Sequence, residues 1–65
     1  MRIRLNGEMV DAGGSTLDEI LKAHGYADAV VATAVNGAFV TVDDRVSVKI
    51  EAGDSVEVLA PMQGG

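Results

Sequence analysis

The 65-residue sequence contains no cysteine and no tryptophan, and it has only one proline, one phenylalanine and one tyrosine. Without cysteine, the chain has no disulfide framework, no thiolate metal site and no cysteine nucleophile. A chain of this length buries about 60% of the surface that its unfolded form exposes, so its core is small and leaves little room for a wide catalytic pocket. We therefore expect one domain over residues 1–65 that suits a reducing compartment, the cytoplasm.

Basic residues are also scarce, with five Lys and Arg against ten Asp and Glu and a formal net charge of -5. This charge repels phosphate backbones, and the basic residues form no run, which argues against a nucleic-acid partner. Residues 1–6 alternate apolar and polar side chains and lack the apolar run of a signal peptide or a membrane span. A basic protein surface is the partner that fits this charge best.

Two segments near the start of the chain predict a β-hairpin. Residues 2–5 have the two-residue period of a half-buried strand, and Asn6-Gly7 is a type I′ turn signal. A second short strand over about 8–11 is expected to return.

One helix is predicted after the glycines at 13 and 14. Thr16 is the expected N-cap, and Glu19, three residues later, is placed to reach back to the amide of the cap. Lys22 and Gly25 supply the stop signal. The side chains that share one face of this helix are Leu17, Ile20, Leu21 and His24.

The second half of the chain is rich in β-forming residues. The run 30–35 predicts a central strand covered on much of both faces, followed by a hairpin turn at Asn36-Gly37. Residues 39–42 and 46–50 are expected to form short edge segments. After a turn at 53–54, residues 55–59 alternate, which directs Val56 and Val58 to one face and Leu59 to the other.

This order of elements predicts an α+β fold of the β-grasp kind, with one helix packed on a mixed sheet of four to five strands. Several polar features receive structural explanations. The loop 13–16 lacks the lysine of a phosphate-binding loop, and His24 is expected to be a half-buried structural residue. The acidic residues do not have the spacing of a calcium loop and are expected to be solvated turn carboxylates: Asp43, Asp44, Glu51 and Asp54. We expect no metal site and no catalytic residue.

The ending 61–65, Pro-Met-Gln-Gly-Gly, predicts a flexible tail. Gly64 and Gly65 lack a Cβ atom, so such a tail can thread a channel too narrow for side chains. A carboxylate becomes a useful electrophile only when its oxygen is made a leaving group, for example by adenylation in a partner enzyme. The chain would then be a substrate and carrier, not an enzyme; the alternative is a terminus without a role. Leu59 is predicted to lie on the open sheet face, either as a docking residue or as an ordinary exposed leucine.

Several motifs together resemble the ThiS family, the ubiquitin-like β-grasp sulfur carriers of thiamine (thiazole) biosynthesis. The resemblance covers essentially the whole chain, and the ending is its most specific part. The motifs are Asn6-Gly7, Thr16-Leu17, Val35-Asn36-Gly37 with Val40, Gly53-Asp54-Ser55-Val56-Glu57-Val58, and Ala60-Pro61-Met62-Gln63-Gly64-Gly65.

The resemblance implies a function. A ThiF-like adenylyltransferase uses ATP and Mg²⁺ to adenylate the carboxylate of Gly65, and sulfur from a cysteine desulfurase then replaces the adenylate. The resulting thiocarboxylate delivers sulfur to a ThiG-like thiazole synthase. The carrier binds no cofactor and is a monomer when free. Leu59 docks against the partners, and the residues implied to enter the partner active sites are Pro61, Met62, Gln63, Gly64 and Gly65.

Three alternatives use the same tail differently. The chain could be the MoaD-like small subunit of molybdopterin synthase, which would form a stable complex with the large synthase subunit. It could be a ubiquitin-like protein modifier joined through Gly65 to lysines, which would give covalent conjugates in cells. It could also be an adaptor with an idle tail, in which case deletion of the tail would have no effect.

Overall fold

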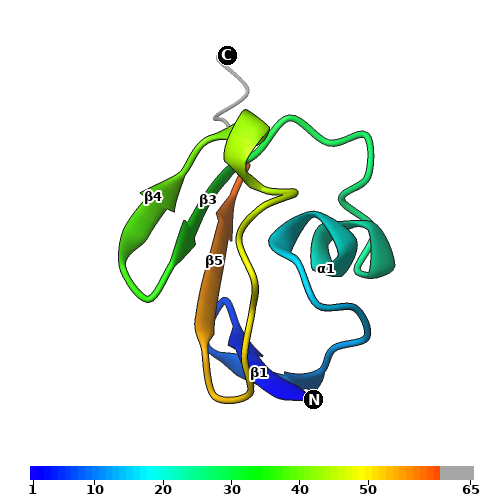
Figure 1. Ribbon diagram of the computed structural model, residues 1–65, viewed down its shortest axis with the longest axis vertical. Coiled ribbons are helices and arrows are strands. Elements are labelled where there is room, and N and C mark those ends of the chain that lie inside the picture. The colour runs from blue at the N-terminus through cyan, green and yellow to red at the C-terminus, as the bar shows by residue number, and fades with distance from the viewer. Residues whose placement is uncertain (61–65) are drawn as a thin grey trace.

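In the computed structural model, the α-helix packs against one face of a β-sheet, as the ribbon shows (Figure 1). The structure describes residues 1–60. This arrangement confirms the predicted α+β fold. The elements in chain order are β1 (Arg2–Leu5), β2 (Glu8–Asp11), α1 (Leu17–Ala23), β3 (Ala32–Val35), β4 (Ala38–Val40), the 3-10 helix η1 (Val42–Asp44) and β5 (Ser55–Leu59).

The sheet has five strands in the order β2-β1-β5-β3-β4. β1 and β5 are parallel, and the other three pairs are antiparallel, so the sheet is mixed, as predicted. The last strand of the chain therefore lies in the middle, between the two hairpins. β5 pairs with β1 at Ser55 and Val56 and with β3 over Val56–Leu59, so the end of β5 is paired with β3.

Both predicted hairpin turns are present. Asn6 and Gly7 have φ values of 50° and 86°, and Asn36 and Gly37 have φ values of 51° and 85°. A type I′ turn requires a positive φ at both central positions, and asparagine and glycine adopt such values with the least strain. The two turns thus fix the registers of β1 with β2 and of β3 with β4.

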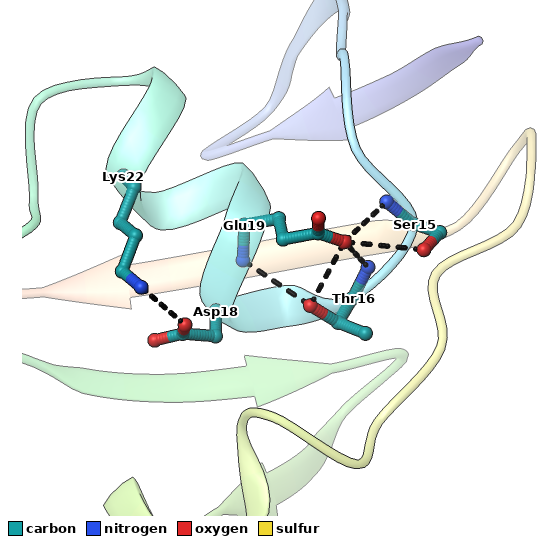
Figure 2. A network of polar contacts seen from close by, with 5 residues as sticks. All are labelled: Ser15, Thr16, Asp18, Glu19 and Lys22. Carbon is teal, nitrogen blue, oxygen red and sulfur yellow. Dashed lines mark hydrogen bonds and ion pairs between the residues drawn. The ribbon is translucent and has the colours of Figure 1, made fainter.

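The helix begins with the predicted capping box, drawn in Figure 2. The Glu19 N–H donates to Thr16 Oγ1 at 3.3 Å, while the Thr16 N–H donates to Glu19 Oε1 at 3.1 Å. The Ser15 N–H donates to the same carboxylate oxygen at 3.0 Å. Hydrogen bonds from the backbone of Ser15 and then of Thr16 hold the pKa of Glu19 below its ordinary value. An ion pair of 2.9 Å joins Asp18 to Lys22 one turn further on.

The core lies between α1 and the face of the sheet that the helix covers. The helix contributes Leu17, Ile20 and Leu21, which agrees with the predicted apolar stripe, and His24 is half-buried at its end, as expected. The remaining buried apolar residues come from the sheet and from the segments that cross the same face: Ile3, Ala12, Val40, Ile50, Val56 and Val58.

The strand predicted over 30–35 is an interior strand, as expected, because it pairs with β5 on one side and with the edge strand β4 on the other. The prediction was wrong about where the strand starts and how it is covered. The strand begins only at Ala32. Its coverage is also one-sided, because Thr33 is buried and Ala32 is exposed. The reason is that the one helix of residues 1–60 covers one face of the sheet, so the other face stays open along β3.

Residues 46–50 do not form an edge strand of the sheet, contrary to the prediction. The segment instead runs beside the start of the helix, where the Leu17 N–H donates to Val48 O at 2.9 Å and the Ile50 N–H donates to Ser15 O at 2.8 Å. A single bridge pairs Thr16 with Lys49. The apolar residues of this segment suggested a strand, and one of them, Ile50, packs into the core.

Candidate functional site

Leu59 lies on the open face of the sheet at the end of β5. The strand alternates as predicted, with Val56 and Val58 buried and Leu59 69% exposed. The register pairs Leu59 with Ala32 of β3. Since directly opposed residues of paired strands share a face, these two side chains are neighbours on the open side.

A second large apolar side chain, Phe39 of β4, lies on the same face and is 71% exposed. Phe39 is paired with Ala34, and Ala34 is paired on its other side with Glu57. The small alanines between Phe39 and Leu59 leave a hollow in the sheet surface. Its lining residues are Ala32, Thr33, Ala34, Phe39, Glu57 and Leu59.

An adjoining hollow extends this surface to the end of the described chain. It is lined by Val30, Val31, Ala32, Leu59 and Ala60, so it shares two residues with the first hollow. Val30 is 80% exposed. Contiguous exposed apolar surface of this kind marks interaction sites on small proteins. We use the term docking face for Val30, Ala32, Ala34, Phe39 and Leu59.

One charged group, Glu57, lines the first hollow. Within residues 1–60 the one ion pair joins Lys22 to Asp18, so the Glu57 carboxylate has no cationic partner in that part of the chain. A partner that covers the docking face without leaving this carboxylate unpaired must offer it a basic group. The surface therefore fits an apolar partner surface that carries a lysine or arginine.

The asparagines of the two hairpin turns hold β5 from opposite sides. The Ser55 N–H donates to Asn36 Oδ1 at 2.9 Å, and the Asn36 N–H donates to Ser55 O at 2.7 Å. At the other end, the Asn6 N–H donates to Val56 O at 2.9 Å, and the Val58 N–H donates to Asn6 Oδ1 at 2.8 Å. These hydrogen bonds continue the pairing of β5 past the last residues of β1 and β3. They help to hold β5 in place at both of its ends.

Of the site residues predicted from the sequence, Leu59 is on the open face as expected. Phe39 and Val30 are not among the predicted residues. Phe39 carried a usable signal, because the Asn36-Gly37 turn sets the register and the alternation with buried Val40 turns Phe39 to the opposite face. The other predicted site residues lie outside the described residues: Pro61, Met62, Gln63, Gly64 and Gly65.

The polar features of the remaining loops have structural roles. At the helix start the Glu19 carboxylate accepts hydrogen bonds from the N–H groups of Ser15 and Thr16, so these two groups are not free to bind an anion. Asp54 accepts the Glu51 N–H at 2.8 Å and an Asn36 Nδ2–H at 3.1 Å, and these bonds lower the pKa of its carboxyl group. The His24 N–H donates to Ile20 O at 3.1 Å, at the end of the helix.

No group of three or more His, Cys, Asp or Glu side chains in residues 1–60 is placed to hold a metal ion. No helix in the same range is long and apolar enough to cross a membrane.

A mixed five-stranded sheet with its last strand in the middle and one helix across it defines a β-grasp domain, here with an exposed apolar face at the end of that strand. The model of the ThiS family matches residues 2–65. The chain belongs to this family.

Solved structures agree with the family match. The chain is similar to the crystal structure of the thiamine biosynthesis protein ThiS from Geobacter metallireducens, with 29% identity, full coverage of both chains and a TM-score of 0.85. It is also similar to the solution structure of a thiamine biosynthesis protein from the same organism, with 30% identity, coverage of 100% of this chain and 88% of the other, and a TM-score of 0.78. A comparison with curated protein sequences gives no significant match.

Proposed function

We propose that this chain is a sulfur carrier of thiamine biosynthesis that transports sulfur as a thiocarboxylate on Gly65. The observation that carries the proposal is the ThiS family match, which continues through the Gly-Gly ending to residue 65. The similarity to two thiamine biosynthesis structures over the full length of the chain supports the same role.

The chemistry begins with activation of the Gly65 carboxylate. A carboxylate oxygen attacks the α-phosphorus of ATP in a ThiF-like adenylyltransferase, pyrophosphate leaves, and an acyl-adenylate forms. A cysteine desulfurase supplies the sulfur as a persulfide, whose terminal sulfur adds to the acyl carbon and displaces AMP. A thiol reductant then cleaves the sulfur–sulfur bond of the resulting acyl disulfide. The product is a thiocarboxylate, whose sulfur is a better nucleophile than the original oxygen and is passed to a ThiG-like thiazole synthase.

In this proposal the chain itself is not an enzyme. ATP and Mg²⁺ are used by the adenylating partner, and the carrier contributes a tail and a surface that the partner recognises. Gly64 and Gly65 suit the tail because residues without side chains fit a narrow channel. The absence of cysteine is compatible with the role, since the transported sulfur is bonded to a backbone carbon.

The docking face supplies the recognition step. It includes a hollow lined by Ala60, so a partner that covers Leu59 and Val30 also contacts Ala60. Burial of two large apolar side chains provides affinity, while pairing of Glu57 with a basic residue provides orientation.

The first test of the proposal is ATP–pyrophosphate exchange with a purified ThiF-like enzyme. The wild-type chain supports exchange, whereas Gly65→Phe and a chain extended by one alanine after Gly65 do not. Met9→Ala is the control, because Met9 is an exposed residue of β2, at the edge of the sheet farthest from β4 and apart from the tail and the docking face. Equal exchange with the extended chain would contradict the proposal.

A second test assigns the pathway. The thiocarboxylated chain is mixed with a ThiG-like thiazole synthase or with the large subunit of molybdopterin synthase, each with its own acceptor substrate. Sulfur transfer in the thiazole reaction alone is the expected result. Transfer in the pterin reaction alone would replace the thiamine assignment with that of a molybdopterin synthase subunit.

A further inference from the structure

Arg45 is a buried cation next to the docking face. It follows η1, and it is 8% exposed. None of the ion pairs within residues 1–60 involves it, since the single pair there joins Lys22 to Asp18. A buried charge is unfavourable unless hydrogen bonds compensate for lost hydration, so the contacts of this guanidinium group define where it can lie.

The guanidinium group reaches two acceptors at the start of β3. Nη2 donates to Val31 O at 2.6 Å, and Nε donates to Thr33 Oγ1 at 3.2 Å. Thr33, which is 2% exposed, donates its hydroxyl hydrogen onward to Val40 O at 2.9 Å. One side chain thus links the loop after η1 to both β3 and β4 from the covered side of the sheet.

The backbone of Arg45 is itself anchored. Its carbonyl oxygen accepts the Asp18 N–H at 3.1 Å, at the first turn of α1. This hydrogen bond ties the backbone of Arg45 to the helix, so the helix helps to fix the position of the guanidinium group relative to β3.

The two residues that Arg45 contacts flank Ala32. Because successive side chains of a strand point to opposite faces, contacts at residues 31 and 33 from the covered side hold the intervening alanine on the open side. Ala32 lines both hollows of the docking face together with Leu59, and Val31 lines one of them. Arg45 is thus hydrogen-bonded to the residues on both sides of Ala32, which lines both hollows.

We propose that Arg45 is a positioning residue for partner docking. Its planar fork holds the start of β3 in the position that gives the docking face its shape. The tests of this proposal that use an adenylating partner rest on the proposed function. Lysine does not replace arginine here, because a single ammonium group lacks the fixed fork that serves two acceptors.

The experiment compares steady-state adenylation of Arg45→Lys, Arg45→Met and wild type, with Lys49→Met as a control that removes an exposed cation. Measurements are made below the unfolding transition of every variant. We expect the KM for the carrier to rise by roughly fivefold to tenfold in both Arg45 variants, as for a displaced interface residue, with kcat unchanged. Because the carrier is the varied substrate, loss of folded carrier would raise its apparent KM, so its concentration is corrected for the folded fraction of each variant, measured by circular dichroism. A KM equal to that of wild type after this correction, or a fall in kcat alone, would overturn the proposal.

Thr33 provides a second pair of variants in case Arg45→Met does not fold. Thr33→Val removes the acceptor of the Nε hydrogen bond while keeping the shape of the side chain, and Thr33→Ser keeps the hydroxyl. Thr33→Val is expected to raise KM, and Thr33→Ser to restore the wild-type value. Equal KM values for these two variants would also overturn the proposal.

A measurement without a partner separates this inference from the proposed function. In Arg45→Lys, amide hydrogen exchange is expected to become faster in β3 than in β1, and the methyl resonances of Ala32 and Leu59 to shift. If wild type is not adenylated but these changes occur, the proposed function fails and the positioning role stands. Unchanged exchange and methyl shifts would reject the positioning role whatever the result of the adenylation assay.

Discussion

The side chain of Asn6 accepts a hydrogen bond from the Val58 N–H at 2.8 Å, across 52 positions of the sequence. The turn of the first hairpin therefore holds the last strand at a point where β1 has already ended. Val58 precedes Leu59, so this contact links the turn of the first hairpin to the end of β5, where the docking face lies.

Replacement of Asn6 by glycine is expected to destabilise the chain by about 1 kcal/mol, because the partly buried Val58 N–H loses its acceptor. Glycine keeps the positive φ of the turn, so backbone strain does not contribute. Asn6→Asp, which retains an acceptor oxygen, is the control and should stay close to wild type. Urea unfolding measures both, and equal stability of Asn6→Gly and wild type would show that the contact contributes nothing.

Substitution at Gly14 is expected to be harmful, and the same substitution at Gly13 is not. Gly14 has a φ of 96°, and a Cβ atom there would lie 2.8 Å from Glu19 Cβ, whereas a Cβ atom at Gly13 meets nothing within 4 Å. The left-handed conformation alone makes Gly14→Ala unfavourable by about 1–2 kcal/mol. The difference between the two urea midpoints tests this, and equal midpoints would contradict it.

Stability is expected to fall as the solution becomes acidic. Hydrogen bonds in the folded state lower the pKa of Glu19 from 4.5 and that of Asp54 from 3.8. A lowered carboxyl pKa adds stability that is fully present above the unfolded pKa and is lost as the pH falls through the folded pKa. The double variant Glu19→Gln, Asp54→Asn should therefore show a weaker dependence of the urea midpoint on pH below about 5. A slope as steep as that of wild type would exclude these two groups as its source.

The docking face is expected to affect binding and not stability. Leu59→Ser and Phe39→Ser remove side chains that are mostly exposed in the free chain, so unfolding should change little. Each should weaken binding to the adenylating partner by roughly tenfold, as expected for a large apolar residue at an interface. Met9→Ser, an exposed apolar residue of β2 far along the sheet, is the matched control. Calorimetric titration measures the affinities, and equal losses for all three variants would count against a localised surface.

The elements whose local signals are strong were predictable from the sequence. The type I′ turns at Asn6 and Asn36 and the capping box of Thr16 and Glu19 depend on side chains within four positions of one another, so the sequence specifies them directly. The alternation around Leu59 identified the open face for the same reason. The predicted tail chemistry rests on family resemblance, and residues 61–65 lie outside the described part of the structure.

The features that could not be predicted depend on contacts between distant segments. Residues 46–50 have the composition of a strand, but hydrogen bonds to residues 15–17 decide that they run beside the helix start. Val30 belongs to a β-forming run, yet it is exposed because the strand begins only at Ala32. Arg45 carries no local signal at all, since its acceptors lie 12 and 14 positions away in the sequence.

The most direct test of sulfur transport is the intact mass of the chain after incubation with ATP and Mg²⁺, a ThiF-like enzyme, a cysteine desulfurase, cysteine and a thiol reductant such as dithiothreitol. Deletion of Gly65 supplies the control. The proposed role predicts a mass gain equal to the exchange of one oxygen for sulfur in wild type and no gain in the deletion variant. An unchanged wild-type mass with an enzyme shown to be active on its own carrier, or an equal gain in the deletion variant, would contradict it.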